Sequence, residues 1–522
     1  MTTANETQLL HIGLHAASQP DKAAALMADT GEALTYRQLN ERSRKVATYL
    51  RRQGLKSGDH VAVLMRSCLD YFVATWAARR SELHFTPINW HLTPDEIAYI
   101  IEDCGARAVF VTETEQPTLD GVLSKLPKVS TLITTGRAQG SFVSLDDIYA
   151  AESLDTPLEE REGQIMFYSS GTTGRPKGIK RPVDGVPFGT TVLADKLAGA
   201  VYGFEIHDVQ LAVAPLYHAA PLSWAMSAQR TGSTVVVMPR FDPSEVLRLI
   251  EHHRVTHIQF VPTMFSRLLN LSDAERRQRD LSSLKCIVHA AAPCPVDVKR
   301  RMIEWWGPII SEYYAGSEGN GYCMVSAKEW LANPGTVGRP LFGQVHILDG
   351  EENEIPPGQV GQIYFGGGAR FEYHGDSEKT RNAYSKQGYS TLGDFGYLDA
   401  DGYLYIADRR TDLILSGGVN VYPRETEEVL MLHPAVLDVG VIGVPNPDLG
   451  QEVMAVIELK PGQTASPALA DELMQFCRSK IAHFKCPRRI EFAALPRTET
   501  GKLLRRKLKE RYSGVADMAR QT

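Results

Sequence analysis

Residues 165–178 read IMFYSSGTTGRPKG, a short apolar run followed by hydroxyl side chains, three glycines and a lysine. The glycines let backbone N–H groups approach a polyanion without interference from a Cβ atom, and the hydroxyls and Lys177 add further donors. The segment therefore predicts a phosphate-binding loop that follows a strand. It is not a Walker A loop, because Gly171 and Gly174 are not followed by Gly-Lys-Ser/Thr at the required spacing. A plain surface turn is the alternative.

On either side of this loop the sequence alternates between amphipathic helices and short apolar strands. Helical spacing covers residues 34–53 and 95–103, and strand-like runs cover 60–65, 108–112 and 234–238. Between about residues 20 and 340 this alternation predicts α/β layers with largely parallel sheets. Residues 341–407 contain short strands with close turn signals, which predict a smaller β-rich subdomain.

The composition is that of an ordinary globular protein. The 522 residues are 43% hydrophobic and 23% charged, and a net charge of −6 argues against a dedicated nucleic-acid binder. No apolar run approaches the roughly 18–20 residues that span a bilayer, and the N-terminus lacks the pattern of a signal peptide, so we expect a cytoplasmic protein without a membrane span. The seven cysteines include no C-x-x-C pair, which predicts reduced thiols.

Further motifs follow the loop in order along the chain. They are PLYHAAP at 215–221, HAAAP at 289–293, YAGSE at 314–318, YSTLGD at 389–394, DRRTDLILSGG at 408–418 and PRTETGK at 496–502. With the loop, this series resembles the adenylate-forming superfamily, and most of all its AMP-forming acyl-CoA synthetases. Because LTYRQLNERSRKVA at 34–47 also has the character of that family, the resemblance covers nearly the whole chain.

The resemblance implies a binding site for ATP. The residues that it implies are Ser169, Ser170, Gly171, Thr172, Thr173, Gly174, Lys177, Ala292, Tyr314, Asp394 and Arg409. In the family the glycine-rich loop holds the β- and γ-phosphates, the tyrosine packs on adenine, and the aspartate accepts the two ribose hydroxyls. For Asp394 and Arg409, ordinary surface charges are the alternative.

Four residues are implied to be catalytic. Lys502 would lie between the attacking carboxylate and the α-phosphate, and His218 near the substrate carboxylate. Ser317 would contact the α-phosphate, and Glu318 would hold Mg²⁺. A histidine such as His218 is more often structural when it is considered alone, so its assignment depends on the neighbouring motif.

The resemblance also implies a mobile C-terminal domain. Residues 1–410 would bind ATP and the acyl substrate, with 341–407 as a barrel-like subdomain, and residues 411–522 would form a small α+β domain that rotates at Thr411. Rotation would bring Ser416, Gly417 and Gly418 to the pantetheine of CoA. Residues 478–511 carry 12 basic and 3 acidic side chains, which fits either contacts to the CoA phosphates or a solvated basic face.

The acyl substrate is the least defined part of this interpretation. Trp224, Ala290 and Gly316 are candidate residues of an acyl pocket. The small residues at 219–220 and 290–292 indicate a roomy, apolar pocket for a bulky or medium-to-long acid, or else close packing of backbones. Residues 217–223 contain no acidic side chain that could bind an amino-acid ammonium group.

We therefore expect an ATP-dependent acyl-CoA ligase that uses a carboxylic acid, ATP, Mg²⁺ and CoA and has no redox cofactor. A homodimer is compatible with the sequence. The alternatives are an enzyme that loads a carrier protein, and a nucleotide-binding regulator without catalysis. Nothing in the sequence specifically supports a luciferase-like oxygenase.

Overall fold

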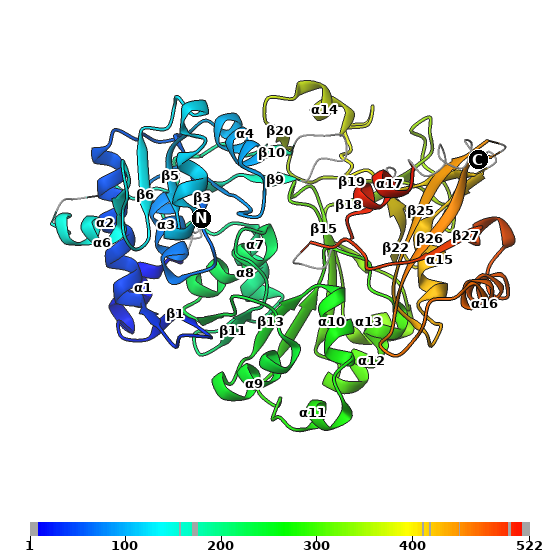
Figure 1. The fold of residues 1–522 in the computed structure, drawn as a ribbon. Coiled ribbons are helices and arrows are strands. Elements are labelled where there is room, and N and C mark those ends of the chain that lie inside the picture. The colour runs from blue at the N-terminus through cyan, green and yellow to red at the C-terminus, as the bar shows by residue number, and fades with distance from the viewer. Residues whose placement is uncertain are drawn as a thin grey trace, which may run out of the picture. The chain divides into compact units, whose positions relative to one another are not determined.

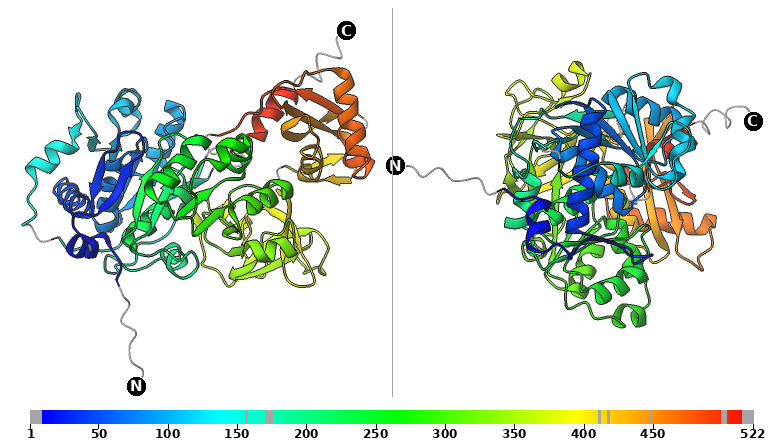
Figure 2. Two further views of the ribbon diagram at one scale, coloured as in Figure 1. Left: turned by 90° about the horizontal axis from the view of Figure 1, so that it is seen from below. Right: turned by 90° about the vertical axis from the view of Figure 1, so that its left-hand side faces the viewer.

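The computed structural model describes residues 9–155, 158–169, 176–409, 412–416, 419–447, 449–498 and 503–513 (Figure 1). The chain divides into two compact units. The first unit comprises residues 1–260, 271–287 and 371–381, and the second comprises 261–270, 288–370 and 382–522. Figure 2 shows the elements from two further directions.

A parallel six-stranded sheet forms one layer of the first unit. Its strands, in spatial order, are β7 (Val143–Ser144), β6 (Thr131–Thr134), β5 (Ala106–Val111), β3 (His60–Leu64), β4 (His84–Pro87) and β8 (Gln164–Ile165). Every neighbouring pair is parallel. Every residue of the central strands β3 and β4 is buried, so both faces of the sheet are covered there, as near-continuous apolar runs predict. The predicted parallel α/β layers are confirmed.

In helix α4, residues at each end determine where the helix begins and stops. It spans Pro94–Cys104, close to the predicted range of 95–103. The Thr93 side chain accepts a hydrogen bond from the backbone N–H of Glu96, and Gly105 ends the helix with a left-handed φ of 69°. These local signals explain the accuracy of the prediction.

The predicted helix at 34–53 begins later than expected. Residues Ala33–Thr35 form strand β2, and helix α2 spans Tyr36–Arg52. Thr35 caps the helix, because its side chain accepts from Gln38 N while the Gln38 side chain accepts from Thr35 N. Pairing of β2 with β1 (Ala23–Met27) wins over helical propensity at these residues.

The first unit contains a second layer of strands. Their spatial order is β13 (His257–Phe260), β11 (Val209–Ala212), β12 (Thr234–Val237), β1 and β2, and only β2 runs antiparallel to its neighbour. Helix α3 (Leu69–Arg80) contacts β3 and β4 of the first layer and β1 of the second. Residues 71–80 of this helix are all buried, as its position between two sheets requires.

The remaining helices of the first unit connect or cover these sheets. They are α1 (Ile12–Ser18), α5 (Gln116–Asp120), α6 (Leu145–Ala151), α7 (Leu193–Ala200), α8 (Ala219–Arg230), α9 (Pro243–His253), α11 (Asp273–Arg277) and α14 (Ser377–Asn382, which ends at the unit boundary). A small antiparallel sheet consists of β20 (Glu372–Tyr373), β10 (Lys177–Lys180) and β9 (Phe167–Ser169). This small sheet carries the two ends of the predicted phosphate loop.

The second unit begins with antiparallel strands and short helices. Strand β14 (Cys286–His289) ends in this unit and is followed by β15 (Ile310–Ala315), β16 (Tyr322–Val325) and β17 (Arg339–Phe342), of which the last three are antiparallel. The helices here are α10 (Pro262–Leu269), α12 (Val296–Trp306) and α13 (Ala327–Ala332).

The β-rich subdomain expected at residues 341–407 is an antiparallel sheet. Its order is β18 (Gln344–Leu348), β19 (Gly361–Gly366), β21 (Asp394–Leu398) and β22 (Leu404–Arg409). Ile347, Ile363 and Leu404 pack on one another in its core. The expectation of a barrel-like subdomain is corrected, because β18 and β22 are not paired and the described sheet stays open.

The C-terminal residues of the second unit form an α+β arrangement. A sheet consists of β24 (Val419–Val421), β23 (Ile414–Ser416), β26 (Gly450–Leu459) and β25 (Val436–Asn446), with β27 (Arg489–Phe492) parallel to β26. Its helices are α15 (Pro423–Leu430), α16 (Pro467–Arg478) and α17 (Arg505–Ser513). Alternate residues of β25 and β26 fill two apolar clusters, as expected for a sheet covered on both faces.

All seven cysteines are free thiols, as their spacing predicts. Burial raises the pKa of Cys68 and of Cys477 to about 12. Within the part of the chain that the structure describes, no helix has the length and apolar character needed to cross a membrane.

The stability of the fold is expected to fall with acid, partly because of His60. Burial, followed by the nearby His84, lowers the pKa of His60 well below its usual 6.5. Below that value the unfolded chain binds a proton on His60 that the folded chain does not bind, so acid favours unfolding by about 1.4 kcal/mol per pH unit for this group. Denaturant unfolding at about pH 7 and about pH 5.5 measures the effect.

The His60→Gln variant is the matched control, because glutamine keeps a polar group beside Thr86, whose Oγ1 lies 2.8 Å from His60 Nε2. Its unfolding should depend less on pH than that of the unsubstituted protein. Identical pH dependence in the two proteins would show that His60 does not contribute.

Candidate functional site

A hairpin in the first unit carries the predicted phosphate loop. Strands β9 and β10 pair antiparallel with Ser169 opposite Lys177, and β10 also pairs with β20. Of the predicted loop residues, Ser170, Gly171, Thr172, Thr173 and Gly174 lie outside the described residues, and only the backbone of Ser169 is described. The structure therefore describes the two ends of the loop and the strands that hold them.

The base of this hairpin is fixed by two tyrosines. The Tyr168 hydroxyl donates to Asp103 Oδ2 at 2.6 Å, and the Tyr99 hydroxyl donates to the Pro176 carbonyl at 3.2 Å. Burial raises the pKa of Tyr168, so its hydroxyl stays protonated as a donor. A Cβ atom at Gly178 would lie 2.0 Å from Met166 Cε and 3.0 Å from Tyr168 Cζ, so these two side chains fill the space beside the glycine. The loop thus starts from a rigid base.

Lys177 has an acidic partner in the first unit that sequence reasoning missed. Its Nζ lies 3.1 Å from Asp376 Oδ2, and this hydrogen bond raises the pKa of Lys177. Asp376 also accepts from the backbone N–H of Lys379 at 2.9 Å, which together with Lys177 lowers the pKa of its carboxyl. Asp376 belongs to no recognised motif. It lies near Lys177 because β20, which precedes Asp376 in the sequence, pairs with β10.

His218 directly precedes helix α8, and Trp224 lies within it. His218 is the N-cap residue of α8, and its ring lies 4.4 Å from that of Tyr217, measured between centroids. Trp224 is 8% exposed and packs on Tyr202 and Phe204 at centroid distances of 4.6 and 5.5 Å. The predicted acyl-pocket tryptophan is therefore part of an aromatic cluster.

In the second unit, the structure brings Tyr314, Asp394 and the backbone of Arg409 together. The Tyr314 hydroxyl donates to Asp394 Oδ2 at 2.7 Å. Asp394 is 3% exposed and begins β21, where Arg409 of β22 is its register partner. The side chain of Arg409 lies outside the described residues. An aromatic ring and a carboxylate separated by 80 positions in the sequence thus share one location.

Residues 316–319 form a tight turn that presents Glu318. The Gly319 N–H donates to the Gly316 carbonyl at 3.0 Å, and Gly319 has a left-handed φ of 64°. A Cβ at Gly316 would lie 2.7 Å from Glu318 Oε2, so the carboxylate occupies the space that the missing Cβ leaves. Ser317 is exposed, whereas Glu318 is 8% exposed. Gly316 therefore has a packing role beyond the predicted acyl-pocket role.

The predicted adenine wall follows strand β14. Ala290 is 2% exposed, Ala292 is half-buried, and Ala291 is exposed with a φ of 71°. Such a φ favours glycine, and alanine adopts it only at an energetic cost. Surrounding contacts must therefore hold this segment in place.

The predicted C-terminal residues are described only in part. Ser416 ends β23, where it pairs with Val419 of β24 and with Gly450 of β26. Thr411, Gly417, Gly418 and Lys502 lie outside the described residues. Arg497 and Leu503 form an isolated antiparallel bridge, and Arg497 Nε donates to Asp438 Oδ2 at 2.6 Å.

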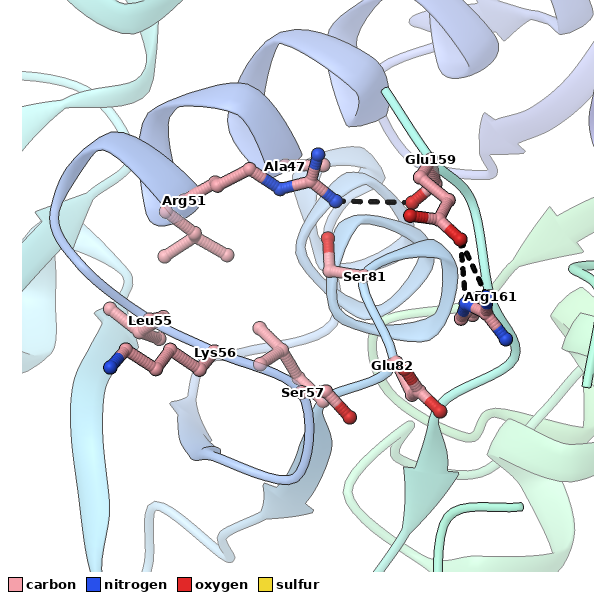
Figure 3. A pocket seen from close by; sticks show the side chains of 11 residues that line it. Ala47, Arg51, Leu55, Lys56, Ser57, Ser81, Glu82, Glu159 and Arg161 are labelled. Carbon is pink, nitrogen blue, oxygen red and sulfur yellow. Dashed lines mark hydrogen bonds and ion pairs between the residues drawn. The ribbon is translucent and has the colours of Figure 1, made fainter. Parts of the chain in front are cut away.

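A cavity of about 270 Å³ in the first unit shares no residue with the predicted site (Figure 3). The Arg51 guanidinium donates to the Glu159 carbonyl at 3.1 Å, and Arg161 pairs with the Glu159 carboxylate at 2.6 Å. Glu82, with a φ of 57°, and Ser81 line another side. These contacts connect α2, the end of α3 and the 158–161 segment, so the cavity lies where structural elements join.

Known proteins similar to this chain include a matching enzyme family and several ligases. Residues 14–372 match the family described as AMP-binding enzyme, and residues 425–502 match the AMP-binding enzyme C-terminal domain. A fatty acid–[acyl-carrier-protein] ligase, ScoC of Streptomyces coeruleorubidus, is 32% identical over 99% of this chain and 98% of its own. A 2-succinylbenzoate–CoA ligase of Bacillus licheniformis is 31% identical over 94% and 97%.

A solved structure extends the likeness to the fold. The o-succinylbenzoate CoA synthetase MenE of Bacillus subtilis, in complex with the acyl-adenylate intermediate OSB-AMP, has a TM-score of 0.80 and 26% identity, with 96% of this chain and 98% of that chain covered. The matched family covers more than half of the chain, and ordered motifs and fold agree with it. The chain therefore belongs to the AMP-binding enzymes of the adenylate-forming superfamily, and it is an AMP-forming acid–thiol ligase.

Proposed function

We propose that the protein joins a carboxylic acid to CoA in two steps at the residues described above. In the first step a carboxylate oxygen attacks the α-phosphorus of ATP, the bond from that phosphorus to pyrophosphate breaks, and an acyl-adenylate forms. In the second step the thiol sulfur of CoA attacks the acyl carbon, the bond to AMP breaks, and the thiol proton leaves to solvent. The poor leaving group of the free acid is thereby replaced by AMP.

The Tyr314–Asp394 hydrogen bond is the observation that carries this proposal. It unites two residues from separate ATP-binding motifs and presents a ring beside a buried carboxylate. A carboxylate can accept from two hydroxyls at once, which suits the ribose of ATP. The hairpin based on Tyr168 and Gly178 would offer its N–H groups and Lys177 to the β- and γ-phosphates.

Lys177 must exchange partners for this role. Its present partner Asp376 lies 3.1 Å away, and the Lys177 side chain is 29% exposed. An ion pair with this exposure is weak, so phosphate oxygens can replace the carboxylate at small cost. Asp376 would then keep Lys177 extended before ATP binds.

Glu318 fits the proposed Mg²⁺ site. Mg²⁺ prefers oxygen ligands and is usually held by one or two protein carboxylates together with substrate phosphates. Glu318 supplies one such carboxylate beside the space left by Gly316. When bound, Mg²⁺ would neutralise charge on the phosphate oxygens.

The other predicted site residues have proposed roles in the same two steps. Lys502 would stabilise charge at the α-phosphate, with Ser317 donating a hydrogen bond there and His218 lying near the acid. Rotation at Thr411 would then replace Lys502 by residues 416–418, whose glycines leave room for pantetheine. The aromatic cluster of Trp224, which packs on Tyr202 and Phe204, supports an apolar acid as substrate.

The proposal is tested by AMP release from ATP and Mg²⁺ with a panel of carboxylic acids and CoA. AMP should appear only when an acid is present, and the preferred acid should be apolar. Absence of AMP with every acid would contradict the proposed activity and would favour a nucleotide-binding regulator.

A carrier protein is the second candidate acceptor. The similarity to ScoC, a ligase named for an acyl-carrier protein, favours it specifically. Supplying the acyl-adenylate with either free CoA or a carrier protein bearing phosphopantetheine separates the two acceptors. Thioester formation with CoA supports the first proposal, whereas formation with the carrier alone supports the second.

Replacement of Asp394 by asparagine is expected to weaken ATP binding. The change keeps an acceptor for the Tyr314 hydroxyl but removes the charge from the proposed ribose contact. Hydrogen bonds to charged groups contribute about 1.5–3 kcal/mol, so the Kd for ATP should rise roughly 10- to 100-fold. Calorimetric titration with ATP measures it, and an unchanged Kd would remove Asp394 from the ribose site.

A further inference from the structure

A buried ion pair of the second unit involves β15, the strand that also carries Tyr314. Lys299 of α12 donates to Glu312 Oε2 of β15 at 2.6 Å, and the two residues are 0% and 6% exposed. His289, which is also 0% exposed, has its Nε2 atom 3.4 Å from Glu312 Oε2. Burial, followed by the charge of Lys299, lowers the pKa of His289 well below 6.5. No step of the proposed reaction uses these three residues.

The cluster is connected to one wall of the pocket through strand β15. Side chains alternate along a strand, so Glu312 and Tyr314, two positions apart, lie on the same side of β15. The Tyr314 hydroxyl in turn donates to Asp394. A shift of Glu312 would therefore change the position of the ring proposed to pack on adenine and its contact with the carboxylate proposed to bind ribose.

The same cluster borders the second wall through His289. This residue ends β14, a neighbour of β15, and immediately precedes the 290–292 segment. Ala291 in that segment has a φ of 71°, a conformation that persists only where its surroundings enforce it. Phe265 packs edge-on against His289 with 5.3 Å between the ring centroids, which leaves the imidazole little room to move.

Stability alone is a poor explanation for this ion pair. Taking two charges out of water is costly, and apolar residues of similar size often stabilise a protein as well or better. The Lys299 ammonium also lies 4.8 Å from the centre of the Trp330 ring, so a precise set of contacts holds it. The pair joins α12 to β15, and His289 at the end of β14 lies beside it, so one cluster contacts all three elements.

We propose that Lys299 and Glu312, acting through Tyr314 and His289, are positioning residues that set the separation of the two walls of the nucleotide pocket. This inference rests on the proposed function. Neither residue touches the substrate. Their effect is on the affinity for ATP rather than on the affinity for the acid.

The test replaces both charges with apolar residues. Lys299→Met/Glu312→Leu leaves no unpaired buried charge and is therefore expected to fold, which circular dichroism and denaturant unfolding verify. The Kd for ATP should rise about three- to thirtyfold, the range of coupling through packed elements, while the KM for the acid stays unchanged. Because the Kd is measured by calorimetry without acid, this readout is separate from the catalytic assay.

Arg301→Met provides the matched control. Arg301 lies on the same helix as Lys299, but its partner Asp297 is 3.6 Å away and the pair is exposed. This variant should bind ATP as the unsubstituted protein does.

Two results would overturn the inference: an unchanged ATP Kd in a folded double variant, or an equal loss of affinity for ATP and acid. Absence of AMP release from the unsubstituted protein would instead contradict the proposed function. If the double variant does not fold, Glu312→Asp serves in its place, and an unchanged ATP Kd in that variant overturns the inference as well.

Discussion

Replacement of Lys502 by alanine should lower the rate of acyl-adenylate formation about 10²- to 10³-fold, the loss typical of one donor to developing charge. The reason is that Lys502 is proposed to lie where the attacking carboxylate and the α-phosphate bring negative charge together. The rate of thioester formation from supplied acyl-adenylate should change little, because the proposed rotation at Thr411 takes the lysine out of the site in that step. Single-turnover measurements of each half-reaction give the two rates.

Lys507→Ala is the control for this prediction. Lys507 lies on α17, is exposed, and belongs to the same basic tail, so its removal changes the net charge equally. Both half-reactions should proceed normally in this variant. Equal slowing of the two half-reactions by Lys502→Ala would contradict the proposed role.

The largest loss of stability is expected from Glu162→Ala. Glu162 is paired with Arg79 and Arg230, and all three side chains are less than 10% exposed. Glu162 Oε2 also accepts from the Gly189 N–H at 2.8 Å. Removal of the carboxylate takes away a negative charge that balances two buried guanidinium groups. The free energy of unfolding should therefore fall by about 3–5 kcal/mol. Denaturant unfolding of the first unit, followed by circular dichroism, should show this decrease.

Glu245→Ala is the matched comparison. Glu245 pairs with Arg248 at 2.6 Å, but both side chains are about 40% exposed. An exposed pair contributes about 0–1 kcal/mol, so this variant should unfold near the midpoint of the unsubstituted protein. Similar effects of the two substitutions would show that burial does not decide the contribution of Glu162.

Much of the fold could be predicted because its signals are local. The 93–105 segment carries its own cap, first-turn proline and terminal glycine, and the apolar run at 60–65 is typical of a strand covered on both faces. The start of α2 is predicted less well, because residues 33–35 pair with β1, and β1 is itself held in the sheet by β12, about 200 positions later in the sequence.

In the candidate site, too, some residues could be predicted from the sequence and others could not. Tyr314 and Asp394 could be identified because each lies in a recognisable motif. Asp376 and Glu312 could not, since their partners Lys177 and Lys299 are selected by strand pairing and burial, which leave no periodic signal in the sequence. The expectation of a barrel-like subdomain at 341–407 was also wrong, because the number of strands does not determine whether the sheet closes into a barrel.

The sequence by itself determined the family, the order of the α/β elements and the residue types available for phosphate, ribose and metal. These properties depend on neighbouring residues and on side-chain chemistry, which the linear order already contains. Only the tertiary structure decided that Tyr314 donates to Asp394, that Glu318 fills the space beside Gly316 and that Lys299 and Glu312 form a buried ion pair. The physical reason is that such contacts join residues whose proximity results from packing and desolvation, and these act on the folded chain as a whole.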